Sequence, residues 1–118
     1  MKNTENKIIG YIEGYYGRIL SWKNRKLIIK SLHKNNMNTY FYAPKEDVCH
    51  RLYWRKKYSK KWRLNFQGFT QLSKKNNINV IAGVAPGLDF NFKELQNVSI
   101  NNKNSDFEIL FKKAKQLL

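Results

Sequence analysis

Three short apolar segments, each running directly into glycine, proline or charged residues, constrain the fold of this 118-residue chain more than any other feature. They are Ile8 and Ile9 before residues 10–18, residues 39–42 before residues 43–47, and residues 79–84 before residues 85–89. A β-branched or aromatic run with such boundaries is typical of a buried strand. Polar residues at the carboxyl ends of strands are where α/β barrels and open α/β sheets keep their chemistry.

Amphipathic helices are predicted between and after these strands. Ser21 is a candidate N-cap for a helix over residues 22–34, and residues 61–75 carry a second helical pattern. Ser105 and Glu108 fit a capping box at the start of a third helix. The apolar face of that third helix is expected to consist of Phe107, Leu110, Phe111, Ala114 and Leu118.

The order strand–helix, repeated three times, predicts an α/β fold with parallel strands joined by crossover helices. Three βα units cannot close an eight-stranded barrel, which takes about 250 residues. Three strands alone would also leave two bare sheet edges. We therefore expect residues 1–118 to form the N-terminal portion of a (β/α)8 TIM-type barrel, or else a small open sheet.

The composition excludes several classes of protein. Hydrophobic residues make up 42% and aromatic residues 14% of the chain, which is too much for a disordered segment. No run of about 18 apolar residues is present, so neither a membrane span nor a membrane partner is expected. The N-terminus lacks the apolar stretch of about 7–15 residues that a signal peptide needs. The single cysteine, Cys49, excludes an internal disulfide, and a cytoplasmic location is expected.

No residue pattern indicates a cofactor or a metal. The two histidines, His33 and His50, do not have metal-ligand spacing, and one cysteine cannot build a zinc site. The sequence contains no phosphate loop and no dinucleotide-binding fingerprint. We therefore expect no cofactor and no metal, and a structural place for His33 within the first helix.

The net charge of +15 favours a different function from the one that the residues at the strand ends indicate. A positive field attracts nucleic acid, and residues 50–63 interleave basic and aromatic side chains as single-strand binders do. Compositional drift toward lysine and asparagine explains the same charge, because it adds lysines to solvated faces without making a site. We favour drift, so nucleic acid is not the expected partner, and a nucleic-acid-binding module stays an alternative.

The residues at the strand ends form the candidate site. Gly14 would let a ligand approach the backbone beside Tyr16, although a tight turn with packed tyrosines explains the same residues. Lys45 would donate to a substrate hydroxyl or an anion, although a solvated charge cluster also explains it. Glu46 and Asp47 are neighbours in an extended segment and point to opposite sides, so they are not expected to form an acid–base pair.

Four segments belong to one further pattern. They are residues 10–18 (GYIEGYYGR), residues 38–47 (NTYFYAPKED), the spaced set His50, Arg51, Trp54, Arg55 and Tyr58, and residues 85–89 (APGLD). Together they resemble the N-terminal part of the family 84 glycoside hydrolases, the β-N-acetylglucosaminidases that include protein O-GlcNAcases. The resemblance covers nearly the whole chain, in the family's order and with family-like spacing.

The resemblance implies a barrel enzyme that removes terminal β-linked N-acetylglucosamine from a glycan or glycoprotein. In that family the sugar's own 2-acetamido oxygen attacks the anomeric carbon, and two neighbouring aspartates orient the acetamido group and supply the acid. By resemblance, Gly14 would offer its carbonyl and Lys45 its amine to sugar hydroxyls, and Tyr16 would line the pocket floor. Supporting positions would be Glu13, Arg18, Asp47 and Asp89.

The catalytic pair of the family has no counterpart in this chain. The family's aspartates follow the fourth strand, no Asp-Asp dipeptide occurs here, and Glu46 stands where the family usually has aspartate. We therefore expect no catalytic residue in this chain and no glycosidase activity of the chain alone. A second chain or a downstream segment would complete the barrel. A sugar-binding remnant without chemistry is the alternative.

Overall fold

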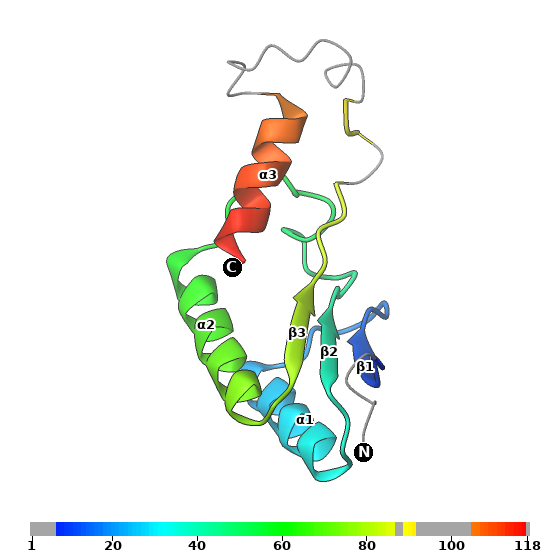
Figure 1. Ribbon diagram of the computed structural model, residues 1–118. Coiled ribbons are helices and arrows are strands. Elements are labelled where there is room, and N and C mark those ends of the chain that lie inside the picture. Colours follow the sequence, from blue (N-terminus) through cyan, green and yellow to red (C-terminus); the bar gives the residue numbers. More distant parts are fainter. Residues whose placement is uncertain (1–6, 87–88, 92–104, 118) are drawn as a thin grey trace.

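The computed structural model describes residues 7–86, 89–91 and 105–117. In chain order the elements are β1 (Gly10–Glu13), α1 (Trp22–Lys34), β2 (Thr39–Tyr42), α2 (Lys60–Lys75), β3 (Asn79–Ala82) and α3 (Asp106–Gln116) (Figure 1). The predicted alternation of strands and helices is confirmed. Within the described ranges, no helix has the length and apolar character needed to span a membrane.

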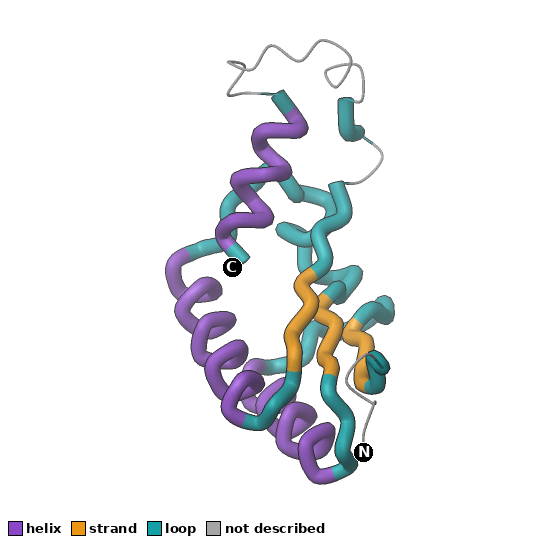
Figure 2. Tube along the Cα trace, in the orientation of Figure 1, coloured by secondary structure: helices purple, strands orange, loops and turns teal. Residues whose placement is uncertain are grey.

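The strands form one parallel sheet in the order β1-β2-β3, as the alternation predicts. Helices α1 and α2 lie against one face of this sheet, and α3 lies beyond the carboxyl ends of the strands (Figures 1 and 2). On the other face Ile12, Phe41 and Ile81 lie in register across the three strands. Ile12 and Ile81 are exposed, so no described element covers that face.

Local capping signals set the ends of α1 and α2. The Ser21 hydroxyl accepts from the Asn24 amide at 3.1 Å, which is the predicted N-cap, and the chain leaves α1 through Asn36 at φ 59°. The second helix repeats this arrangement with a Ser59 cap and with Asn77 at φ 58°. The Ser59 cap starts α2 at Lys60, one residue earlier than its periodicity indicates.

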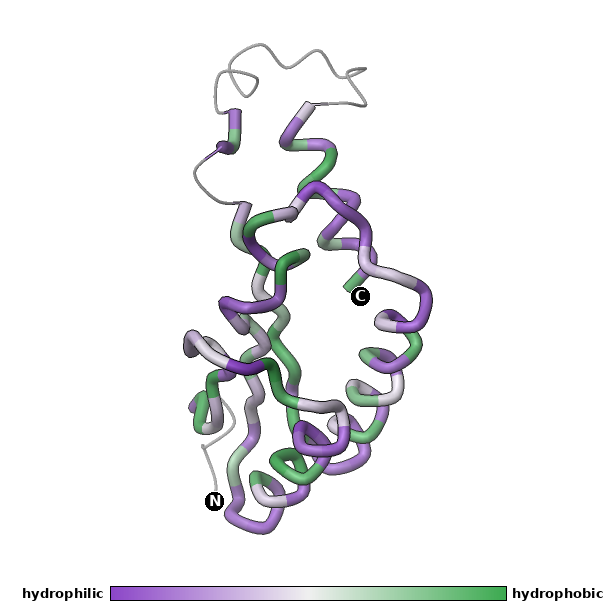
Figure 3. The backbone as a smooth tube through the Cα atoms, turned by 180° about the vertical axis from the view of Figure 1, so that it is seen from behind, coloured by the Kyte–Doolittle hydropathy of each residue, from purple (hydrophilic) through white to green (hydrophobic). Residues whose placement is uncertain are grey.

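The core between the sheet and the two helices is largely aromatic. Tyr40 and Tyr42 point from β2 toward α2, where the Tyr40–Phe69 and Tyr42–Phe66 ring centroids lie 5.0 and 5.8 Å apart. Ile29 of α1 is fully buried beside them. Hydrophilic positions alternate with hydrophobic ones along both helices (Figure 3), as expected of helices with one face on a core.

The first strand differs from the prediction. The sequence predicts a buried strand at Ile8 and Ile9, but both side chains are exposed, and the strand comprises Gly10–Glu13. Gly10 lies so close to β2 that an added Cβ would be 1.7 Å from the Thr39 carbonyl oxygen. The two isoleucines precede an edge strand, and no described helix covers them. The third strand is also shorter than predicted and ends at Ala82.

The third helix packs on a different face from the predicted one. Phe107 and Phe111 are exposed, whereas Asp106 and Lys113 are buried, and Leu118 lies outside the described residues. The Lys113 amine donates to the Lys56 carbonyl and lies 4.3 Å from the centroid of the Tyr58 ring. Polar contacts with the loop before α2 therefore orient α3, and they turn its two phenylalanines outward.

One buried ion pair joins β1 to α1. The Glu13 carboxylate accepts from Arg25 Nε and Nη2, both at 2.9 Å, and from the Tyr40 hydroxyl. Glu13 and Arg25 are 0% and 2% exposed, so each charge depends on the other in place of water. The Arg25 guanidinium also lies 4.5 Å from the centroid of the Trp22 ring. This contact places the end of β1 relative to the first helix.

Replacing Arg25 with methionine is expected to lower the free energy of unfolding by about 3–5 kcal/mol, because it leaves the Glu13 carboxylate buried and unpaired. The double variant Glu13→Gln, Arg25→Met removes both charges and should recover part of that loss. Urea denaturation followed by circular dichroism measures both effects. Equal stabilities of the R25M variant and the unmodified chain would show that the pair does not hold α1 to β1.

Candidate functional site

The loops that follow the three strands lie side by side at one end of the sheet. The Lys45 amide donates to the Tyr15 carbonyl at 3.4 Å, which joins the loop after β2 to the loop after β1. The Ala85 amide donates to the His50 carbonyl at 3.0 Å and joins the segment after β3 to the same cluster. The parallel sheet thus gathers the three strand ends, as expected of a ligand site in an α/β fold.

The residues predicted to bind a ligand lie on these loops with unused polar groups. Within the described residues, neither the Gly14 carbonyl nor the Lys45 amine has a hydrogen-bond partner. Both residues are half-buried. Tyr16 is 70% exposed, and the Arg51 guanidinium lies 5.9 Å from the centroid of its ring. Tyr16 therefore lies at the rim of the described surface.

Asp47 fixes the loop that carries Lys45. Its carboxylate is almost fully buried and accepts from two hydroxyls, those of Tyr42 at 2.6 Å and Tyr58 at 2.8 Å. It also accepts from the backbone amides of Cys49 and His50, at 2.9 and 3.2 Å. Burial and the adjacent carboxylate raise the pKa of both tyrosines, so their hydroxyls stay protonated and continue to donate.

His50 joins the loop after β2 to the end of β3. Its Nδ1 lies 2.7 Å from the Gly83 carbonyl oxygen and must carry the proton, because a carbonyl only accepts. A Cβ at Gly83 would lie 3.3 Å from the His50 ring and 3.2 Å from Ala43. Burial lowers the pKa of His50, and the charges of Lys45 and Arg51 act in the same direction. The imidazole is therefore held neutral as a donor.

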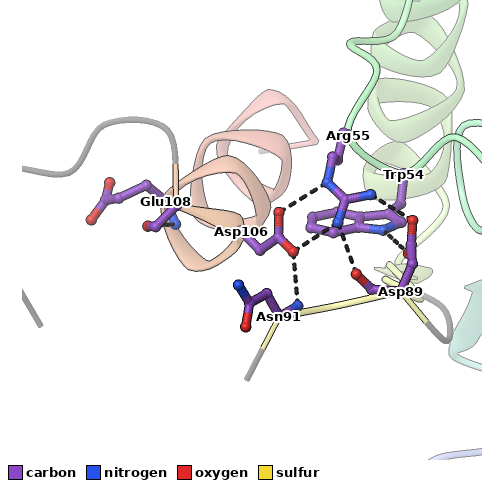
Figure 4. A network of polar contacts seen from close by, with 7 residues as sticks. Trp54, Arg55, Asp89, Asn91, Asp106 and Glu108 are labelled. Carbon is purple, nitrogen blue, oxygen red and sulfur yellow. Dashed lines mark hydrogen bonds and ion pairs between the residues drawn. The ribbon is translucent and has the colours of Figure 1, made fainter. Parts of the chain in front are cut away.

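Arg55 connects Asp89, which follows β3, to Asp106 at the start of α3 (Figure 4). Its guanidinium donates to the Asp89 carboxylate at 2.6 Å and to the Asp106 carboxylate at 2.9 and 2.7 Å. The Trp54 indole donates to Asp89 at 3.0 Å, and the Asn91 amide donates to Asp106 at 2.8 Å. Hydrogen bonds from Arg55 lower the pKa of both carboxyls, so each stays ionised.

The other predicted supporting residues differ in their surroundings. Glu13 is committed to Arg25 and Tyr40 in the core. Arg18 is exposed and makes no hydrogen bond or ion pair with the described residues. Gly87 and Leu88, which are part of the residue 85–89 motif, lie outside the described residues.

The sequence does not indicate a role for Asp106, which lies within the predicted capping box between Ser105 and Glu108. A carboxylate directly after the Ser105 cap is explained locally by the helix dipole, so its pairing with Arg55 leaves no separate signal in the sequence. His50 and Asp47 belong to the sequence motifs described above. Their hydrogen-bond partners come from other loops and strands, and the motif does not reveal them.

Three of the four aromatic residues of the segment 50–63 pack against other rings or are buried, whereas Tyr53 is 62% exposed. Trp54 is fully buried, and the Trp62 ring is stacked between Tyr58 at 3.6 Å and Phe66 at 4.8 Å. These rings do not offer the open faces on which nucleic-acid bases stack. Tyr53 is the one exposed aromatic residue of this described segment, so the segment does not present the series of open rings that a single-strand binder uses.

Known proteins resemble this chain in sequence and in fold. A family model described as beta-N-acetylglucosaminidase matches residues 9–118. Curated proteins named Protein O-GlcNAcase from Rattus norvegicus and Mus musculus are each 34% identical over 99 residues, which cover 84% of this chain and 11% of theirs. A mutant of the Thermobaculum terrenum O-GlcNAc hydrolase superposes with a TM-score of 0.79 at 28% identity, over 93% of this chain and 22% of that structure. The structure of CpGH84B superposes with a TM-score of 0.80 at 31% identity, over 94% of this chain and 19% of that structure.

The parallel sheet and its gathered strand ends thus match part of the fold of these two solved structures. The chain belongs to the β-N-acetylglucosaminidase family, which confirms the resemblance drawn from the four motifs. It spans about a tenth of the length of the curated relatives that it matches. The predicted fold class, an α/β partial barrel with parallel strands, is also confirmed.

Stability is expected to fall between pH 7 and 5 because of His50. The unfolded imidazole takes a proton near its ordinary pKa of about 6.5, whereas the buried imidazole resists it, so protons favour the unfolded chain in this window. Asp47, Lys45 and Arg51 are the charged groups around it. Hydrogen bonds from Arg55 lower the pKa of Asp89 and Asp106, so these residues reduce stability only at more acidic pH, below about 4, where the unfolded carboxylates take up protons.

Thermal unfolding at half-unit pH steps from about 7 to 5 measures this dependence. The His50→Asn variant keeps a side-chain donor and cannot titrate, so its melting temperature should change less over the same steps. His33→Asn serves as the control, because His33 is an exposed residue of α1 whose Nδ1 also lies close to a backbone carbonyl oxygen, that of Asn76 at 3.0 Å. A pH dependence that persists unchanged in the H50N variant would contradict this assignment.

Proposed function

We propose that this chain supplies one side of the N-acetylglucosamine site of a β-N-acetylglucosaminidase. The observation that carries the proposal is the contact between the Lys45 amide and the Tyr15 carbonyl, which puts the Gly14 and Lys45 loops together. In this proposal the Gly14 carbonyl accepts from a sugar hydroxyl, and the Lys45 amine donates to sugar oxygens. Tyr16 contributes an apolar ring to the pocket floor once further chain encloses it.

The proposed reaction is substrate-assisted hydrolysis of a terminal β-linked N-acetylglucosamine on a glycan or glycoprotein. The sugar's 2-acetamido oxygen attacks the anomeric carbon, the glycosidic oxygen leaves with a proton from an acid, and water then opens the cyclic intermediate with retention. The proteins similar to this chain include ones named for O-GlcNAc hydrolysis, which supports this substrate class.

Four described carboxylates of this chain, those of Glu13, Asp47, Asp89 and Asp106, do not suit the acid step. A general acid needs a pKa near the working pH, whereas hydrogen bonds from Arg55 lower the pKa of Asp89 and of Asp106. Asp47 and Glu13 are buried against tyrosine hydroxyls and Arg25. We infer that the catalytic acid and the group that orients the acetamide come from polypeptide that completes the barrel, in the same chain or in another.

A sugar-binding remnant is the second candidate function, since binding by Gly14 and Lys45 needs no catalytic carboxylate.

We also propose a reducing compartment such as the cytoplasm, because Cys49 is a free thiol.

The purified chain is expected to bind N-acetylglucosamine weakly and to hydrolyse none. Calorimetry with millimolar sugar should give heat that is lost in the Lys45→Met variant and kept in Lys57→Met, an exposed loop control. A chromogenic N-acetylglucosaminide should show no turnover, because absent acid–base assistance alone costs about 10²–10⁴-fold. Turnover by the chain would contradict the catalytic part of the proposal, and absence of heat from a folded chain would contradict the binding part.

The uncovered face of the sheet is expected to bind hydrophobic dyes in the isolated chain. Ile12 and Ile81 flank Phe41 on that face and are 67% and 37% exposed. Asparagine at both isoleucine positions should lower anilinonaphthalene sulfonate fluorescence without lowering the melting temperature, since no described helix packs there. Leu64→Asn on the outside of α2 is the control. Equal dye binding by all three proteins would argue against this face as the exposed apolar surface of the isolated chain.

A further inference from the structure

A groove lies between α1 and α2, on the helical side of the sheet. Its walls are two lysines from α1 and four residues from the second half of α2: Lys26, Lys30, Gly68, Gln71, Leu72 and Lys75. The end of α2 leads into the start of β3, so the groove is close to the amino ends of the strands. It is therefore separate from the Gly14 and Lys45 loops, which lie at the carboxyl ends.

The positive charge of this groove has no compensation within the two helices. Neither α1 nor α2 contains an aspartate or a glutamate. The ion pairs among the described residues use Arg25 and Arg55, and none of them uses a lysine. Lys26 and Lys30 are one helical turn apart and repel each other, which destabilises a helix unless an anion lies between them.

The floor of the groove is open at Gly68. A Cβ built on this glycine would have no described atom within 4 Å, so close packing does not explain the residue. Glycine inside a helix is destabilising relative to alanine, because the unfolded chain gains more freedom. Gly68 therefore leaves this part of the groove open.

The lysines of α1 continue the groove as a line. Four exposed lysines recur every three or four residues along one side of the helix: Lys23, Lys26, Lys30 and Lys34. At about 1.5 Å per residue they cover roughly 16 Å of helix length. A basic stripe along a helix in a protein of pI 10.0 is the electrostatic pattern of nucleic-acid phosphate binding.

We propose that this groove binds the phosphate backbone of duplex nucleic acid without reading its sequence. The groove residues include no aromatic ring on which an unpaired base would stack, so a duplex fits better than a single strand. Ammonium groups bind phosphates as point charges and carry no base preference. The surface is distinct from the segment 50–63, whose tryptophans are internal.

The test is the salt dependence of duplex binding. Fluorescence anisotropy with a labelled DNA duplex is measured between about 50 and 200 mM salt for the unmodified chain and two triple variants. One variant is K26Q/K30Q/K75Q in the groove. The matched control is K56Q/K57Q/K112Q, which removes the same charge from exposed positions elsewhere. Circular dichroism melting establishes that all three proteins are folded.

The groove variant should lower the slope of log K against log salt by about 2–3, because each lost phosphate contact contributes about 0.9. The control should lower it by less than half as much. Equal losses in the two variants would overturn the proposal in favour of net charge alone. Equal binding of a single strand or of heparin, with the same sensitivity to the groove variant, would overturn the assignment to duplex nucleic acid. The heat of N-acetylglucosamine binding should be the same in all three proteins, which separates this test from that of the sugar site.

Discussion

The buried contact among Glu13, Arg25 and Tyr40 is the interaction on which the rest of the structure depends. A carboxylate and a guanidinium without water must pair, and the paired geometry permits one placement of β1 against α1. Tyr40 extends the contact to β2, whose other side chains build the aromatic core. Gly14 is the residue after Glu13, so the same contact sets the position at which the first site loop begins.

The site loops are held by side chains whose polar atoms form hydrogen bonds within the protein. Asp47 binds two tyrosine hydroxyls, His50 binds the end of β3, and Arg55 binds the aspartates beyond it. The Gly14 carbonyl and the Lys45 amine are not used in this way within the described residues. The geometry of a binding site is fixed in this way: the groups that contact the ligand are free to do so, and the residues behind them are held by hydrogen bonds to the protein.

The Ser21 cap predicted the start of α1, because a serine cap acts through its immediate neighbours. Local signals failed for the burial of Ile8, which depends on whether another element covers the strand. They failed again for α3, where the spacing of Phe107 and Phe111 indicates a buried face. The paired Asp106 and the buried Lys113 orient that helix instead. Periodicity reports which residues share a face, and long-range polar contacts decide which face packs.

The sequence by itself determined the order of the elements, the parallel sheet and the family, because periodicity, caps and motifs are carried by residues close together in the chain. It also indicated Gly14 and Lys45 as the groups at the strand ends. Only the tertiary structure decided that Asp89 and Asp106 share Arg55, that Trp54 and Trp62 are internal, and that lysines of α1 and α2 line one groove. These properties depend on partners far apart in sequence, and folding alone brings them within hydrogen-bonding or packing distance.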